Sequence, residues 1–255
     1  MSLLELWQSL ALSAPEAWLI LITAFVAGTA RGFSGFGSAM IMAPVYASIF
    51  GPAFAVPVVL ILEVLISLPL LASSVKVALY RTVWRLLAGA IIGGAVGLGV
   101  VALLPVDLLK TLVACIVLAF IPLMLFQQSG GGQVRPAGNP LTYLAGGASG
   151  LFGSISGMTG PPAVMLLLKK NLPPQIIRAT LIIYFLLIDI VLVAGYGLWS
   201  QQIHYDWLVL TAVSLIPMIA GGWLGGRLFR LAPAHLFRNL TLLLVALAAL
   251  TGLLV

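Results

Sequence analysis

Long apolar runs follow one another along almost the whole chain, and they limit its fold more than any other feature. Only 7% of the 255 residues are charged and 62% are hydrophobic, whereas a soluble domain carries roughly 25% charged residues. The runs do not alternate every second residue, so they predict helices. Six runs have the length of a membrane-spanning helix, at residues 53–72, 86–104, 108–126, 176–197, 207–225 and 236–255. We therefore expect an all-α integral membrane protein.

Two further apolar segments, residues 18–50 and 141–171, are interrupted by glycine and serine. Each apolar arm has about 12 residues, which as helix covers roughly half of the hydrocarbon core of a bilayer. Two such arms around a polar break predict a hairpin that enters the membrane and returns. Non-helical backbone at that depth must be buried in protein or line a watery cavity, so we expect a site at the breaks.

The two breaks resemble each other. FSGFGS (33–38) aligns with ISGMTG (155–160) at an offset of 122, and IGGAVGLG (92–99) resembles AGGWLGGR (220–227). Each half then holds one hairpin and three spans, and because three is odd the halves are inverted, as in many secondary transporters. The predicted parts are an interfacial segment with the first repeat (1–126), a Gly/Pro-rich cytoplasmic linker (127–140) and the second, inverted repeat (141–255).

The basic residues favour re-entrant hairpins over full crossings. With both hairpins re-entrant, ten of the twelve Lys and Arg residues lie on one side, Lys110 lies on the other, and Arg31 lies within the first hairpin. Because cytoplasmic loops carry the excess of Lys and Arg, this arrangement predicts both chain ends outside. The basic residues stand singly between apolar runs, which is typical of membrane anchors, so no nucleic-acid partner is expected.

The breaks have the features of an anion site. The second arm of each hairpin begins near Ser38 or Gly160, and the free N–H groups of a helix N-terminus favour an anion. Arg31 adds a permanent charge with a planar fork that suits oxyanions. The candidate substrate-binding residues are Arg31, Ser34, Gly35, Phe36, Gly37, Ser38, Ser156, Gly157, Met158, Thr159 and Gly160. An alternative interpretation is that Arg31 pairs with Glu63 as a structural strut.

Two acids, Glu63 and Asp189, lie deep inside predicted spans. Acids at this depth often carry protons or cations, so both are candidates for proton coupling. They lie in corresponding predicted helices of the two halves. With the offset of 122, Asp189 corresponds to Ser67, which is one helical turn from Glu63. The alternative is a neutral acid that forms a hydrogen bond across helices.

Other classes of function fit the sequence less well. GASG (147–150) matches the GxSG of rhomboid-type serine proteases, but His204 and His235 both fall in predicted loops, where neither can act as a base at membrane depth. We therefore expect no enzyme, and the single cysteine and scattered acids indicate no metal or other cofactor. A passive anion channel or uniporter remains an alternative to a carrier, as does a non-transporting assembly factor. The glycine faces at 93–99 and 221–226 allow close helix packing, within one protomer or between two of a homodimer.

The stretches ARGFSGFGSAMIMAPVYASIFG (30–51) and SGLFGSISGMTGPPAVMLLL (149–168) resemble the paired Gly-rich motifs of the TauE/SafE family of sulfite-exporter-like (TSUP) permeases. The resemblance covers nearly the whole chain. It implies a bacterial inner-membrane transporter, coupled to an ion rather than to ATP, for small sulfur-containing anions such as sulfite or sulfonates. The motif match carries over Ser34, Gly35, Gly37, Ser156, Gly157 and Gly160. Phe36 and Met158 make this site more apolar, which would suit a different organic anion.

Overall fold

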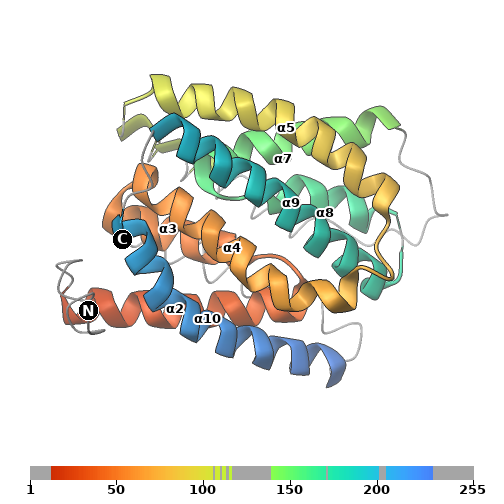
Figure 1. Cartoon of the computed structure of the whole chain (residues 1–255), viewed down its shortest axis with the longest axis horizontal. Helices are drawn as coiled ribbons and strands as arrows, with labels where there is room; N and C mark the ends of the chain where they lie inside the picture. The colour runs from red at the N-terminus through yellow and green to blue at the C-terminus, as the bar shows by residue number, and fades with distance from the viewer. Residues whose placement is uncertain are drawn as a thin grey trace.

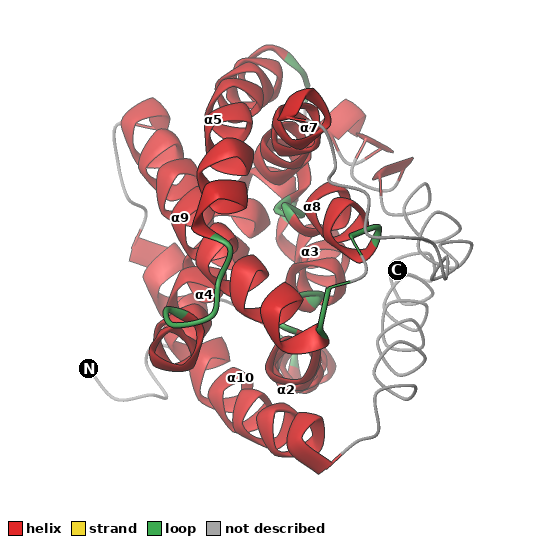
Figure 2. Ribbon diagram, turned by 90° about the vertical axis from the view of Figure 1, so that its right-hand side faces the viewer, coloured by secondary structure: helices red, strands yellow, loops and turns green. Residues whose placement is uncertain are grey.

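In the computed structural model, every regular element of the described chain is an α-helix (Figures 1 and 2). The structure describes residues 13–105, 107–109, 111–112, 115–116, 139–170, 172–200 and 205–231. The helices are α2 (Ala14–Ser34), α3 (Ser38–Phe50), α4 (Pro52–Ser74), α5 (Tyr80–Leu103), α7 (Asn139–Ser156), α8 (Gly160–Leu168), α9 (Pro174–Ser200) and α10 (Tyr205–Leu231). Within these residues, α2, α4, α5, α9 and α10 are long and apolar enough to cross a membrane, which confirms the predicted all-α membrane protein.

The described helices account for four of the six predicted spans. Helices α4, α9 and α10 contain the runs at 53–72, 176–197 and 207–225 and extend beyond them, and α5 contains all but the last residue of the run at 86–104. Most of the predicted span at 108–126, all of that at 236–255 and nearly all of the predicted linker and interfacial segment lie outside the described residues. Helix α7 begins at Asn139, so the last two predicted linker residues are already helical.

Both predicted helix breaks are present where the glycine motifs place them. Residues 35–37 separate α2 from α3, and residues 157–159 separate α7 from α8. Gly35 ends α2 with a φ of 80°, and Gly157 has a φ of 73° at the corresponding position. Such left-handed angles are costly for residues with a Cβ atom. Each of these glycines still donates its N–H to the carbonyl four residues earlier, on Arg31 and Gly153 respectively, at 2.8 Å.

The expectation of half-length first arms is wrong. Helix α2 has 21 residues and α7 has 18, or about 31 and 27 Å at 1.5 Å per residue. Helix α2 starts before the apolar run because Ser13 and Glu16 form a capping box, which satisfies backbone donors at its N-terminus. It also continues through the polar residues as far as Ser34. The second arms are short, with 13 residues in α3 and 9 in α8.

The first helix of each half packs along the last described helix of the other half. Figure 1 shows α2 beside α10 at one edge of the molecule and α5 beside α7 at the opposite edge, with α4 and α9 between them. Glycines bring the paired backbones together: a Cβ atom added at Gly32 would collide with the Gly222 carbonyl, and one at Gly93 with the Gly147 carbonyl. Most of the glycines in the faces at 93–99 and 221–226 thus pack inside this chain, and Gly99 and Gly226 do not.

The two interfaces carry corresponding contacts. A contact between α2 and α10 corresponds to one between α7 and α5 when 122 is added to the α2 residue number and 128 is subtracted from the α10 residue number. The contacts pair Gly28 with Met218 and Gly221 with Phe25 in one interface, and Gly150 with Ala90 and Gly93 with Gly147 in the other. By the same offsets Gly32 and Gly222 correspond to Ser154 and Gly94. The Ser154 hydroxyl donates a hydrogen bond of 2.9 Å to the Gly94 carbonyl. The offsets that align the sequence motifs therefore also align these contacts.

Large apolar side chains cover much of the outside of the bundle. Trp18, Trp84, Ile92, Leu144 and Ile216 are each more than half exposed. Exposed apolar surface of this extent is unfavourable in water and is expected for a surface that lies against lipid. The polar side chains described next lie on the inside instead.

Candidate functional site

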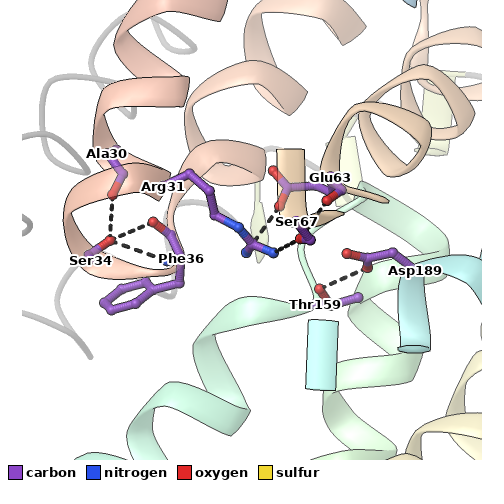
Figure 3. A network of polar contacts seen from close by, with 8 residues as sticks. All are labelled: Ala30, Arg31, Ser34, Phe36, Glu63, Ser67, Thr159 and Asp189. Atoms are coloured by element: carbon purple, nitrogen blue, oxygen red, sulfur yellow. Dashed lines mark hydrogen bonds and ion pairs between the residues drawn. The ribbon is translucent and has the colours of Figure 1, made fainter. Parts of the chain in front are cut away.

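Arg31 lies in the last turn of α2 and is almost completely buried, with 2% of its surface exposed. Its Nη1 atom lies 3.1 Å from Oε2 of Glu63 on α4, and its Nη2 donates to Oγ of Ser67 at 2.6 Å. Figure 3 shows the side chain pointing away from Ser34 and towards Ser67 and Glu63. The ion pair between Arg31 and Glu63 that the sequence raised is therefore present.

The surroundings of the pair explain how a charged residue is held inside an apolar bundle. A buried ion pair needs good geometry and further hydrogen bonds to offset desolvation. Ser67 accepts from Arg31 and also donates to the Glu63 carbonyl at 2.7 Å, which fixes its position on α4. The guanidinium carbon lies 5.0 Å from the centroid of the Phe185 ring on α9, within the range of a cation–π contact.

Asp189 on α9 is the second buried acid, and none of its surface is exposed. Its Oδ1 accepts a hydrogen bond of 3.3 Å from the Thr159 hydroxyl, in the second break. In Figure 3 this pair lies beyond Ser67, on the side towards which the Arg31 guanidinium points. The first break is thus linked to an acid on α4 through Arg31, and the second to an acid on α9 through Thr159.

Three buried polar atoms of this cluster, and the hydroxyl of Ser38 in the first hairpin, have no hydrogen-bond partner among the described residues. They are Nε of Arg31, Oγ of Ser38, Oε1 of Glu63 and Oδ2 of Asp189. Ser38 is the first residue of α3, directly after Gly37 with its φ of 94°. A buried polar atom left without a partner costs free energy, so these atoms are the ones that a ligand would satisfy.

The other predicted substrate-binding residues fall into three groups. The hydroxyls of Ser34 and Ser156 bond to backbone carbonyls of their own hairpins, at 2.7 Å to Ala30 and Phe152 respectively, so their donors are already used. Gly35, Gly37 and Gly157 lie in the breaks themselves, and Gly160 is the first residue of α8. Phe36 and Met158 are buried in the apolar core.

The sequence did not predict the hydrogen bonds by which Tyr184 and Ser149 hold the second break. The Tyr184 hydroxyl donates to Ser149 at 2.7 Å, and the Ser149 hydroxyl in turn donates to the Thr159 carbonyl. Ser149 is the serine of the GASG stretch, and this hydrogen bonding gives it a structural role. The two histidines that an enzyme would need lie outside the described residues. No sequence signal joins Tyr184 to Ser149, because the contact depends on the packing of α7 against α9.

Arg178 was also missed, because the sequence placed it only among the basic anchors. Its Nη2 donates to the Gly32 carbonyl at 2.9 Å, near the end of α2, and its guanidinium lies 4.9 Å from the Phe229 ring centroid. Its side chain also packs beside Gly35, where an added Cβ would come within 2.7 Å of the Arg178 Cγ. A cation at the C-terminal end of a helix is favourable, so Arg178 stabilises the first break from the second half of the chain.

These features together define an integral membrane protein with several spans and a charged cluster enclosed between two broken helices. The chain belongs to the sulfite exporter TauE/SafE family, whose family model matches residues 20–252. Family membership makes it a multi-pass membrane transporter of the sulfite-exporter type. No curated protein and no solved structure matches the chain.

Proposed function

We propose that this protein is a secondary transporter of small sulfur-containing anions, either sulfite or organosulfonates, and that it couples their movement to protons. The observation that carries this proposal is the position of Arg31. Its guanidinium is buried between the two breaks and contacts a carboxylate that an incoming oxyanion can replace. The planar fork of arginine fits sulfite and sulfonate oxygens as it fits a carboxylate.

The groups left without partners support the same assignment. The Ser38 hydroxyl at the start of α3 and Nε of Arg31 have no hydrogen-bond partner within the described part of the chain. The first turn of α3 adds backbone N–H groups of the kind that favour an anion. Phe36, Met158 and Phe185 add apolar surface nearby, which suits the organic part of a sulfonate. A carrier for a different organic anion is the alternative that these apolar residues favour.

Proton coupling is proposed for Glu63 and Asp189, because each has one buried oxygen without a hydrogen-bond partner among the described residues. The corresponding contacts of the α2–α10 and α5–α7 interfaces support an origin by duplication, and the inverted orientation of the halves follows from the predicted span count. Such halves move against each other around a central site in many transporters. We also propose the bacterial inner membrane as the location, with both termini on the periplasmic side. A homodimer stays a prediction.

The test is uptake of labelled sulfite, and separately of a labelled sulfonate, into proteoliposomes with and without a pH gradient. Wild type is compared with Arg31→Gln and with Arg227→Gln, which removes an exposed arginine that stacks on Trp223 at 3.6 Å. We expect saturable uptake that follows the pH gradient, disappears in Arg31→Gln and persists in Arg227→Gln. Flux that is independent of the pH gradient would indicate the alternative, a passive channel or uniporter.

A folding defect in Arg31→Gln must be separated from a binding defect. Removing one partner of a buried ion pair costs about 3–5 kcal/mol, because the other charge is left unpaired. The double variant Arg31→Gln/Glu63→Gln removes both charges of the pair and avoids that cost. Uptake by a stably folded double variant at the wild-type rate would contradict the assignment of Arg31 to the anion.

A further inference from the structure

The buried cluster holds one permanent cation and two acids. Arg31, Glu63 and Asp189 are 2%, 3% and 0% exposed. Glu63 on α4 and Arg31 on α2 lie close enough to Asp189 on α9 for their charges to act on it. If both acids were ionised, the cluster would carry one uncompensated negative charge inside the bundle. An uncompensated buried charge is far more costly than a buried neutral group, so the resting cluster holds one proton.

The contacts place that proton on Asp189. Glu63 has an ion pair with Arg31, whereas Asp189 accepts only the hydrogen bond from Thr159 among the described residues. Tyr184 also faces Asp189, as a neutral phenol. Helices α3 and α8 carry no charged side chain. Among the described residues, the other cation whose charge reaches Arg31 is Arg178, and its guanidinium bonds to the Gly32 carbonyl and lies over the Phe229 ring rather than pairing with either acid.

From this charge balance we infer that the site accepts monovalent anions only, and that each one enters together with one proton. This inference rests on the proposed function. The anion forms an ion pair with Arg31, the Arg31–Glu63 ion pair breaks, and Glu63 takes up the proton on a carboxylate oxygen. The cluster is neutral before and after the exchange. A dianion would leave one negative charge uncompensated even with both acids protonated, so dianions are excluded.

The inference has a quantitative consequence for transport. One proton moving with one monoanion transfers no net charge. A gradient of one pH unit then supports about tenfold accumulation, and a membrane potential supports none. A carrier that moved the monoanion alone would respond to the potential instead, by about tenfold for each ~59 mV.

The experiment uses labelled methanesulfonate as the probe, because a sulfonate stays a monoanion at every working pH and any pH dependence then comes from the protein. Proteoliposomes receive either a pH gradient or a potassium diffusion potential at equal pH. We expect accumulation with the pH gradient and none with the potential. An excess of unlabelled ethanesulfonate should block this uptake, and the dianion ethane-1,2-disulfonate should not. Proton uptake on binding of methanesulfonate, measured in weakly buffered detergent solution, should be one per anion bound.

The variant Glu63→Gln/Asp189→Asn gives a separate test. In each single variant the remaining acid can pair with Arg31 and become protonated when the anion replaces it, so proton uptake on binding is retained. The double variant has no acid left in the cluster to take up a proton. The double variant should bind methanesulfonate without proton uptake, and any flux should follow the potential. Asp206→Asn, which neutralises an exposed acid on α10, is the control and should behave as wild type.

Several results would overturn the inference. Wild-type flux driven by the potential at equal pH would show that charge crosses, and would leave anion transport itself intact. Inhibition by the disulfonate equal to that by ethanesulfonate would remove the restriction to monoanions. Absence of both binding and flux of methanesulfonate would also contradict the inference. The proposed function fails separately, if wild type carries neither sulfite nor a sulfonate.

Discussion

Two neighbouring glycines on α10 allow a sharp test of the close packing between α2 and α10. A Cβ atom at Gly225 would collide with the Thr29 carbonyl and come within 2.8 Å of the Phe33 nitrogen, and both are backbone atoms. At Gly226 a Cβ atom would meet nothing within 4 Å. The variants Gly225→Ala and Gly226→Ala therefore differ in packing alone, because both gain the same helix propensity.

The expected difference follows from that comparison. Gly→Ala in a helix interior is worth about 0.8–1 kcal/mol in favour of alanine in either variant. Extra volume in a closely packed contact costs about 1–3 kcal/mol. Gly225→Ala should therefore be less stable than Gly226→Ala by about 1–3 kcal/mol. For a chain of this size each kcal/mol shifts the melting temperature by about 2–4 °C.

The assay is thermal unfolding of the purified variants in one detergent, followed by the loss of the monodisperse peak in size-exclusion chromatography. Gly226→Ala should melt at or above the wild-type temperature, and Gly225→Ala several degrees below Gly226→Ala. Equal melting temperatures, or a more stable Gly225→Ala, would refute the backbone contact between α2 and α10. Replacing both glycines should give the sum of the two effects if the sites act independently.

Three other side chains give further predictions. Burial and the charge of Arg85 lower the pKa of Lys170. Below that lowered pKa the buried charge of Lys170 destabilises the folded state, and this destabilisation is lost as the pH rises from the lowered pKa towards the ordinary lysine pKa. Thermal unfolding should therefore show wild type gaining more stability than Lys170→Gln between neutral and alkaline pH. Tyr46→Phe removes a buried hydrogen bond of 2.8 Å to Ser214 and should cost about 1–3 kcal/mol, most of which the double change with Ser214→Ala should recover in the same assay. Arg178→Gln should lower the melting temperature and reduce labelled-sulfite uptake, because the end of α2 loses its cation; an unchanged rate and stability would contradict that role.

The positions of the breaks could be predicted because they depend on local chemistry. Glycine adopts left-handed angles at little cost, and Gly35 and Gly157 adopt them within the two predicted motifs. The lengths of the first arms could not be read from hydropathy, because α2 starts at a capping box and continues through Arg31. Apolar runs mark the part of a helix that can face lipid, and they do not mark its ends.

The partners of the buried charges were only partly predictable. Arg31 and Glu63 are the kind of opposite charges that must meet in lipid, so their pairing could be raised as an alternative before the structure was known. The roles of Ser67, Phe185 and Arg178 depend on how α4 and α9 pack, and residues so distant in sequence leave no local signal. The predicted roles of Ser34 and Ser156 as anion donors were weakened by the backbone carbonyls that occupy them.

The pairing of α2 with α10 and of α5 with α7 also bears on how the chain is made. Helix α2 leaves the ribosome long before α10, the helix that covers its glycine face. During synthesis that face must stay in lipid or against neighbouring nascent helices, unable to reach its final contact. Neither half can complete its own packing, so two separately expressed halves should be degraded alone and should rescue each other when they are produced in the same cell.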